Sequence, residues 1–223
     1  MFRELYEEIR DHGGVPRRNF DEERRWLDAF GKRPGIPSAT PEELWELYAL
    51  SRVADLLRID GGYAEFMDAL GLQRIERRAF HPFFHEIVTV GDAFAEVWPG
   101  YMLGALLIAR AGVVADADFP KEIAETSLLH WAYLRANRRT TDLSVGWGHN
   151  SQWRTAFRRD YLLNGVLHYN VDGRRDKQKY DEDLTPDEKL ELLRHRCFVR
   201  CRKRHDDRWP YDDTYREPFA TSS

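Results

Sequence analysis

The sequence predicts a mainly α-helical protein, an α+β fold with a minor sheet, in one compact domain of about seven to eight helices. Three observations favour this fold class. Apolar residues recur at helical spacing over much of the chain, two threonine–proline–acid motifs mark strong helix starts, and few stretches favour strands. The stretches that do favour strands lie near residues 86–90, 141–145 and 165–171.

Length and composition fit this picture. A chain of 223 residues, with 42% apolar and 32% charged residues, is long enough to bury a full core, and its composition is ordinary for a globular protein. We expect a single domain over residues 1–223. Its parts would be a helical N-terminal layer (1–71), a core that holds the functional site (72–206) and a C-terminal tail packed on the body (207–223).

The net charge and the distribution of apolar residues argue against nucleic-acid and membrane partners. The net charge of -4 does not favour binding to nucleic acid, and no apolar run approaches the length of a membrane span. Acidic residues interrupt the N-terminal segment where a secretory signal needs a continuous apolar stretch. Cys197 and Cys201 are spaced to share one helix face rather than to form a disulfide scaffold. These features predict a cytoplasmic protein without a membrane or nucleic-acid partner.

Four helices are expected in the first seventy residues, and we interpret them as scaffold. An apolar stripe that begins at Phe2 predicts the first helix, and Asp21 opens the second. In the segment Thr40–Glu43 a capping threonine is followed by a proline at the first helical position and an acid at the third, so a long helix begins there. A short helix is expected over residues 63–70.

Further helices are expected later in the chain. The apolar run Tyr101–Ala111 is too short to cross a bilayer, and we predict that it forms a central, buried helix. Residues 121–137 are expected to form another. The threonine–proline–acid motif that begins at Thr185 predicts a last helix, which would extend to about His205.

The segment Asp142–Tyr161 concentrates the residue types that favour ligand binding. Glycines flank a tryptophan, polar residues that can cap a helix follow, and aromatic rings then recur every four residues from Trp153 to Tyr161. We therefore predict a loop followed by a helix, on which Arg154 and Arg158 form a cationic row beside the aromatic one. The predicted ligand-binding residues are Gly146, Trp147, Gly148, Asn150, Ser151, Gln152, Arg154 and Arg158.

This loop-helix has the chemistry of an anion site. Main-chain N–H groups at a helix start bind anions, the two arginines would neutralise the ligand, Trp147 would stack on it, and His149 is the predicted catalytic residue for proton transfer. A tight structural turn whose arginines pair with acidic neighbours is the competing interpretation. A dinucleotide site is disfavoured, although Gly146–Ser151 nearly matches G-x-G-x-x-G, because the preceding strand is polar and too few further strands are expected.

The second candidate site consists of His81, His85 and Glu86. Two neutral imidazoles and a carboxylate can begin a zinc or iron site, and together with His149 or His168 they would hold a metal that activates water for hydrolysis. Their order is not that of an H-E-x-x-H motif. Histidines with purely structural partners are the competing interpretation.

Three functions follow from these sites. The first is a pocket for a polar or anionic small molecule on the Gly146–Arg158 loop-helix, in an enzyme or a sensor. The second is a protein–protein contact protein, such as an inhibitor, immunity or assembly factor, because seven tryptophans can contribute to an interface. The third is a metal-dependent hydrolase. The sequence identifies no cofactor, ligand or reaction.

Overall fold

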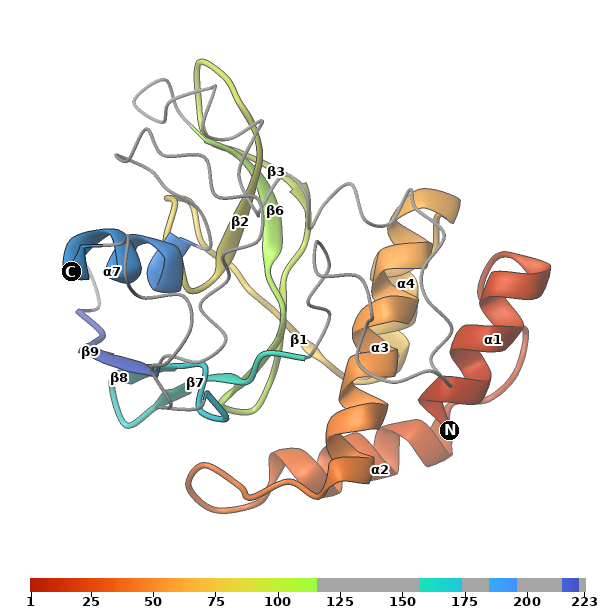
Figure 1. Cartoon of the computed structure of the whole chain (residues 1–223). Helices are drawn as coiled ribbons and strands as arrows, with labels where there is room; N and C mark the ends of the chain where they lie inside the picture. Colours follow the sequence, from red (N-terminus) through yellow and green to blue (C-terminus); the bar gives the residue numbers. More distant parts are fainter. Residues whose placement is uncertain (116–156, 174–184, 196–213, 221–223) are drawn as a thin grey trace.

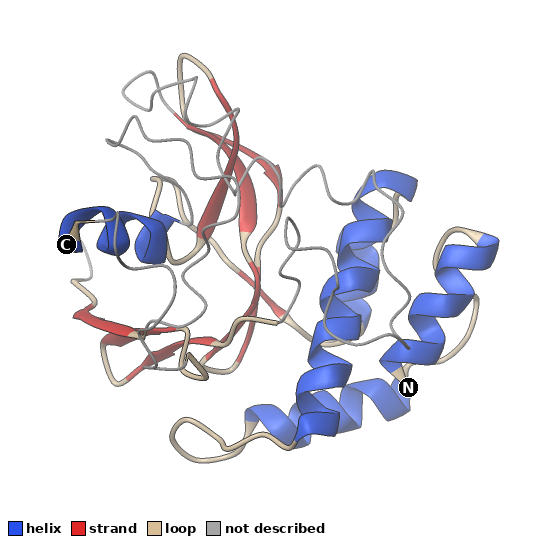
Figure 2. Cartoon of the chain, in the orientation of Figure 1, coloured by secondary structure: helices blue, strands red, loops and turns tan. Residues whose placement is uncertain are grey.

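The computed structural model describes residues 1–115, 157–173, 185–195 and 214–220. In this part of the chain four helices precede the strands, and they pack together on one side of the molecule (Figures 1 and 2). A further helix, α7, lies among the strands on the other side. The helices are α1 (Phe2–His12), α2 (Asp21–Gly31), α3 (Pro41–Asp60), α4 (Tyr63–Ala69) and α7 (Pro186–His195).

Local sequence signals account for these helices. At the start of α3 the hydroxyl of Thr40 accepts a hydrogen bond from the main-chain N–H of Glu43 at 3.2 Å, and the Glu43 carboxylate accepts one from the N–H of Thr40 at 2.9 Å. These two bonds satisfy N–H groups that have no partner inside the helix. The four helices expected in the first seventy residues are confirmed, and so is the helix start at Thr185–Pro186.

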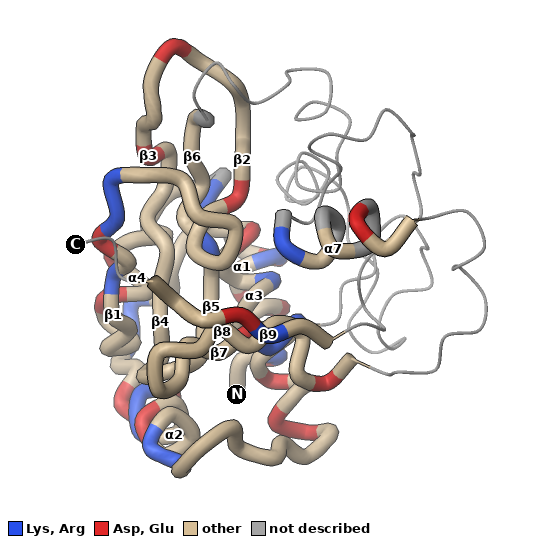
Figure 3. The backbone as a smooth tube through the Cα atoms, turned by 90° about the vertical axis from the view of Figure 1, so that its left-hand side faces the viewer, with Lys and Arg blue, Asp and Glu red and all other residues tan. Residues whose placement is uncertain are grey.

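The described strands form two sheets. Sheet A has six antiparallel strands in the order β1-β4-β5-β7-β8-β9, and in sheet B the strand β6 lies between β2, which is parallel to it, and β3, which is antiparallel. In the side view the strands of sheet B stand above β7, β8 and β9 (Figure 3). The strands are β1 (Gln73–Arg74), β2 (His85–Val90), β3 (Ala95–Trp98), β4 (Tyr101–Leu103), β5 (Leu106–Ala109), β6 (Ala111–Ala115), β7 (Asp160–Leu163), β8 (Val166–Tyr169) and β9 (Tyr215–Pro218).

The predicted fold class was wrong. The structure is an α+β fold with two sheets, not a mainly α-helical protein. The apolar run Tyr101–Ala111 forms β4, β5 and the start of β6 instead of a central helix. Gly104, at φ 56°, turns the chain between β4 and β5. All four residues of β5 are buried, so the run lacks the alternation that identifies a strand.

A second correction concerns the helix expected through Tyr161. Tyr161 lies in β7, where it pairs with Leu106 of β5 and with His168 of β8. Asn164 and Gly165 join β7 to β8 with φ angles of 52° and 69°. An Asn-Gly pair with two positive φ angles is the preferred turn of a two-residue β-hairpin. This local signal outweighs the four-residue spacing of the preceding aromatic residues.

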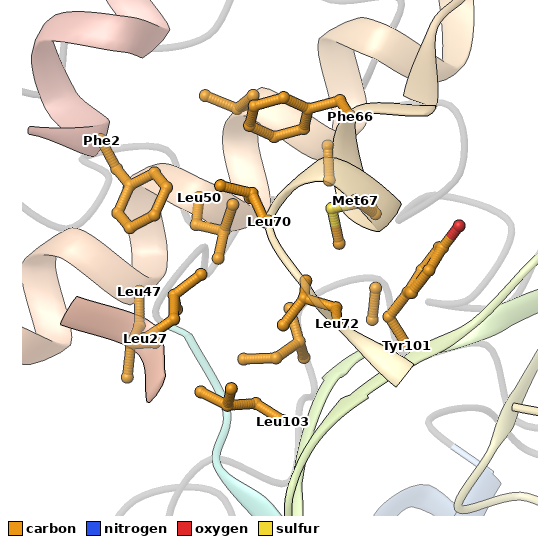
Figure 4. Packing of buried hydrophobic residues seen from close by; sticks show 14 of the residues in the cluster. Phe2, Leu27, Leu47, Leu50, Phe66, Met67, Leu70, Leu72, Tyr101 and Leu103 are labelled. Atoms are coloured by element: carbon orange, nitrogen blue, oxygen red, sulfur yellow. The ribbon is translucent and has the colours of Figure 1, made fainter. Parts of the chain in front are cut away.

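Sheet A separates two apolar clusters. Leu106 and Ile108 of β5 pack against the helices, whereas Leu107 packs on the opposite face, as the two-residue period of a strand requires. The larger cluster is formed by α1–α4 together with β4, β5 and β7 (Figure 4). The smaller cluster lies under α7, and its buried members are Ile75, Phe83, Phe84, Leu107, Leu167, Tyr169 and Leu193.

No helix among residues 1–115, 157–173, 185–195 and 214–220 combines the length and the apolar character that a bilayer crossing needs.

Candidate functional site

Most of the predicted ligand-binding segment lies outside the described residues. This holds for Gly146, Trp147, Gly148, His149, Asn150, Ser151, Gln152 and Arg154, and for the strand expected at 141–145. Arg158 is described, but it is not on a helix: it is extended chain two residues before β7. The expected cationic row on a helix face is therefore wrong at Arg158, because the chain enters sheet A there.

Arg158 belongs to a buried polar network on the α7 face of sheet A, which we call the Asp160 network (Arg110, Arg158, Asp160 and Asn170). Arg158 Nε donates to Asp160 Oδ1 at 2.8 Å, and Arg158 Nη2 donates to the carbonyl oxygen of Leu193 in α7 at 2.9 Å. Arg110 Nη2 donates to Asp160 Oδ2, and the main-chain N–H of Asn170 donates to Asp160 Oδ1 at 2.6 Å. One carboxylate thus serves two guanidinium groups.

The electrostatics of this network depend on burial. Burial alone would raise the pKa of Asp160, but Arg158, Arg110 and the N–H of Asn170 together hold it below its ordinary value. Burial lowers the pKa of Arg158, and Arg110 adds to this effect although Asp160 opposes it. Arg158 is therefore paired with Asp160 inside the protein and does not line the open anion-binding site that was expected there. The described residues contain no direct evidence of ligand or anion binding.

The histidines of the second predicted site lie in one turn, His81 to His85. The main-chain N–H of His81 donates to Nδ1 of His85 at 2.8 Å, and the N–H of Phe83 donates to Nδ1 of His81 at 3.1 Å. Because each Nδ1 accepts a hydrogen bond, the proton of each neutral ring is on Nε2. Burial lowers the pKa of both histidines to about 4, with a further contribution from Arg77, so both are neutral at pH 7.

This arrangement does not favour a metal centre. A neutral imidazole with its proton on Nε2 and its Nδ1 already accepting a main-chain N–H has no free lone pair for a metal. Glu86 follows His85 in β2 and therefore faces the opposite side of the strand, where it lies 3.7 Å from Arg58. Among the described residues, no three His, Cys, Asp or Glu side chains are grouped closely enough to hold a metal ion.

His168, an alternative ligand in that hypothesis, also lies elsewhere. It is on β8 between Leu167 and Tyr169, both of which pack under α7. Successive side chains of a strand alternate between faces, so His168 faces away from the Asp160 network and from His81.

Arg77, which the sequence analysis did not select, lies against two aromatic rings. The guanidinium carbon of Arg77 lies 4.6 Å from the ring centroid of Phe84 and 4.7 Å from that of Phe219. The ring of His81 lies 5.4 Å from Phe84 and 5.8 Å from Phe219. We call these four residues, Arg77, His81, Phe84 and Phe219, the Arg77 stack.

Within the described part of the chain, no carboxylate forms an ion pair with the guanidinium of Arg77. Burial is the cause of its lowered pKa, with no opposing acid, and no ion pair joins it to any described residue. Phe219 follows β9, and its main-chain N–H donates to the carbonyl oxygen of Gly165 at 2.8 Å. Sequence reasoning missed this site because its parts come from distant segments that only the pairing of β9 with β8 brings together.

Comparisons with protein-family models, with curated proteins and with solved structures gave no match.

Proposed function

We propose that this chain is a protein–protein contact protein, and that its Arg77 stack receives an acidic side chain of the partner. The observation that carries this proposal is the position of Arg77: its guanidinium is half-buried, contacts two neighbouring phenyl rings, and has no carboxylate beside it among the described residues. A protein–protein contact protein is the second of the three functions that the sequence favours.

The contacts with the two rings suit Arg77 to bind a carboxylate of the partner. The N–H groups of a guanidinium lie in its plane, so a ring that contacts one of its faces leaves them able to donate. These N–H groups match the two oxygens of a carboxylate, and such paired hydrogen bonds are short and strong. The rings of Phe84 and Phe219 hold the guanidinium in place before binding, so little conformational entropy is lost when the acid docks.

The groups around Arg77 favour a hydrogen-bond acceptor, and not a donor, on the partner. Neutral His81 offers an N–H at Nε2, because its Nδ1 is occupied by the N–H of Phe83. Arginine and aromatic residues are also the types enriched in interface hot spots, where a few side chains supply most of the binding energy. The chemistry therefore fits an aspartate or glutamate that lies beside apolar groups on the partner.

A peptide selection tests the proposal. A random peptide library is selected on the immobilised protein, and the enriched peptides are measured by calorimetry against the wild type and against Arg77→Ala. We expect the enriched peptides to share an acidic residue, and Arg77→Ala to weaken binding by about 2 kcal/mol, roughly 30-fold. Arg77→Lys should also weaken binding, since lysine keeps the charge but loses the planar pair of donors.

The matched control is Arg78→Ala, which removes an exposed arginine next to the stack and changes the net charge equally. It should bind the selected peptides as the wild type does. Melting temperatures of all variants show whether folding is intact. Enriched peptides without acidic residues, or equal losses in Arg77→Ala and Arg78→Ala, would overturn the proposal.

A further inference from the structure

Two imidazole nitrogens hold the turn that carries half of the Arg77 stack. Nδ1 of His85 accepts the main-chain N–H of His81 at 2.8 Å, and Nδ1 of His81 accepts that of Phe83 at 3.1 Å. The main-chain N–H groups of Phe84 and His85 complete the turn, since both donate to the carbonyl oxygen of His81, at 3.0 and 2.9 Å. The turn thereby fixes His81 and Phe84, two of the four residues of the stack.

Only neutral rings can accept the two bonds to Nδ1. A protonated imidazole carries a hydrogen on both nitrogens, so its Nδ1 would face the main-chain N–H as a second donor. The side chain of His85 is also buried, with its ring 6.0 Å from that of Phe80 and 5.3 Å from that of Phe94. A charge among such apolar rings is costly. Protonation of His85 is therefore compatible with an open turn and not with the closed one.

The charged groups around the two rings also oppose protonation of the closed turn. Burial is the main cause of the lowered pKa of both histidines, and neighbouring charges add to it. The described charges that act on the rings are Arg77 before the turn, Arg110 between β5 and β6, Arg194 of α7 and Glu217 of β9. All three arginines lower the pKa of His81, the first two also lower that of His85, and the glutamate alone acts against them, at His81.

We infer that protonation of His85, together with His81, opens this turn and releases the partner, so that the protein binds its partner at neutral pH and loses it in acid. This regulation rests on the function proposed for the Arg77 stack. In the closed turn the histidines have a pKa of about 4, and in an open turn they would return towards the ordinary 6.5. The turn is therefore closed above about pH 6.5 and opens progressively as the pH falls towards 4. Opening separates Phe84 from Arg77, which then lacks one of its two rings.

Amide hydrogen exchange tests the opening of the turn without any partner. The exchange rates of the N–H groups of His81 and Phe83 are measured by NMR at pH 7 and pH 5 and compared with those of an unstructured peptide at the same pH. We expect their protection to fall by roughly 20-fold for each histidine that is protonated on opening.

The reference for this measurement is the N–H of Leu162, which donates to the carbonyl oxygen of Ala105 in sheet A at 2.8 Å. At pH 5 the two N–H groups of the turn should exchange much faster than that of Leu162, because the turn opens while sheet A stays folded. Protection of the turn that does not change with pH, or that equals the protection of Leu162 at both pH values, would overturn the inference.

Binding of a selected acidic peptide tests the consequence for the partner. The wild type should bind the peptide about tenfold or more weakly at pH 5 than at pH 7, because only the closed fraction binds. His85→Asn is the matched variant, since the asparagine oxygen can replace Nδ1 as acceptor and takes up no proton. It should bind like the wild type at pH 7 and keep most of its affinity at pH 5. Titration of the carboxylate of the peptide affects both proteins equally.

The outcomes separate this regulation from the function on which it rests. A wild type whose affinity changes with pH no more than that of His85→Asn would show that the turn does not control binding. If His85→Asn does not fold, the exchange rates of the wild type decide. A library that yields no acidic peptide overturns the proposed function instead, and the exchange rates still show whether the turn opens in acid.

Discussion

At the residue scale, His81 and His85 make the folding stability of the protein depend on pH. Their folded-state pKa is about 4, below the ordinary 6.5, because they are buried. Between these two pH values the unfolded chain binds protons that the folded protein does not. The stability contributed by the neutral rings is therefore complete above about pH 6.5 and is lost as the pH falls towards 4. Burial also lowers the pKa of His168, which acts in the same direction.

The expected result is a melting temperature that declines from pH 7 to pH 4.5. The double variant His81→Asn, His85→Asn should decline less, because the asparagine oxygen can replace Nδ1 as acceptor without taking up a proton. Carboxylates with lowered pKa values, such as Asp160, lose their stabilising effect at lower pH and do not interfere in this window. Parallel slopes for the variant and the wild type would contradict the assignment.

Asp160 provides a second prediction at this scale. Asp160→Asn removes the carboxylate that Arg110 and Arg158 share, so two buried cations lose their counter-ion. We expect a loss of about 3 to 5 kcal/mol in the free energy of unfolding, measured with urea. The control Asp28→Asn breaks an exposed pair with Lys32 and should cost no more than about 1 kcal/mol. Similar losses in both variants would show that the buried network is not stabilising.

At the element scale, the contact between β3 and β6 depends on a glycine. A Cβ atom at Gly112 of β6 would overlap the indole ring of Trp98, whose N–H donates to the carbonyl oxygen of Arg110 at 3.1 Å. Gly112→Ala must displace a buried ring, so it should cost more than Gly165→Ala. At Gly165 there is open space, and the positive φ alone costs about 1 to 2 kcal/mol. Urea unfolding compares the two, and a smaller loss at Gly112 would contradict this packing.

The same scale shows which elements could be predicted. Helices α1–α4 carry their own signals, such as the Thr40 cap and the buried stripe from Phe2, so sequence alone located them. Strand β5 could not be recognised, because a strand buried on both faces has the same apolar run as a buried helix. Strand β8 was expected near residues 165–171, and the Asn164–Gly165 turn was a readable signal that would also have placed β7.

At the scale of the whole molecule, the pairing of strands that are far apart in the sequence determines which residues meet at the candidate sites. The parallel pairing of β2 with β6 and the addition of β9 to β8 join segments far apart in the sequence, and no local pattern specifies either. The Arg77 stack depends on that assembly and could not be predicted. The sequence did single out Arg158, His81 and His85 as unusual, but their burial and their partners follow only from the fold.

The most direct test of the central claim, that Arg77 receives a carboxylate of a protein partner, is a double-mutant cycle. A selected peptide and its Glu→Gln form are each titrated into the wild type and into Arg77→Ala. If the glutamate docks on Arg77, its replacement should weaken binding to the wild type by roughly 30-fold and should scarcely affect binding to Arg77→Ala. Equal weakening in both proteins would show that the two groups do not interact, and the account would be wrong.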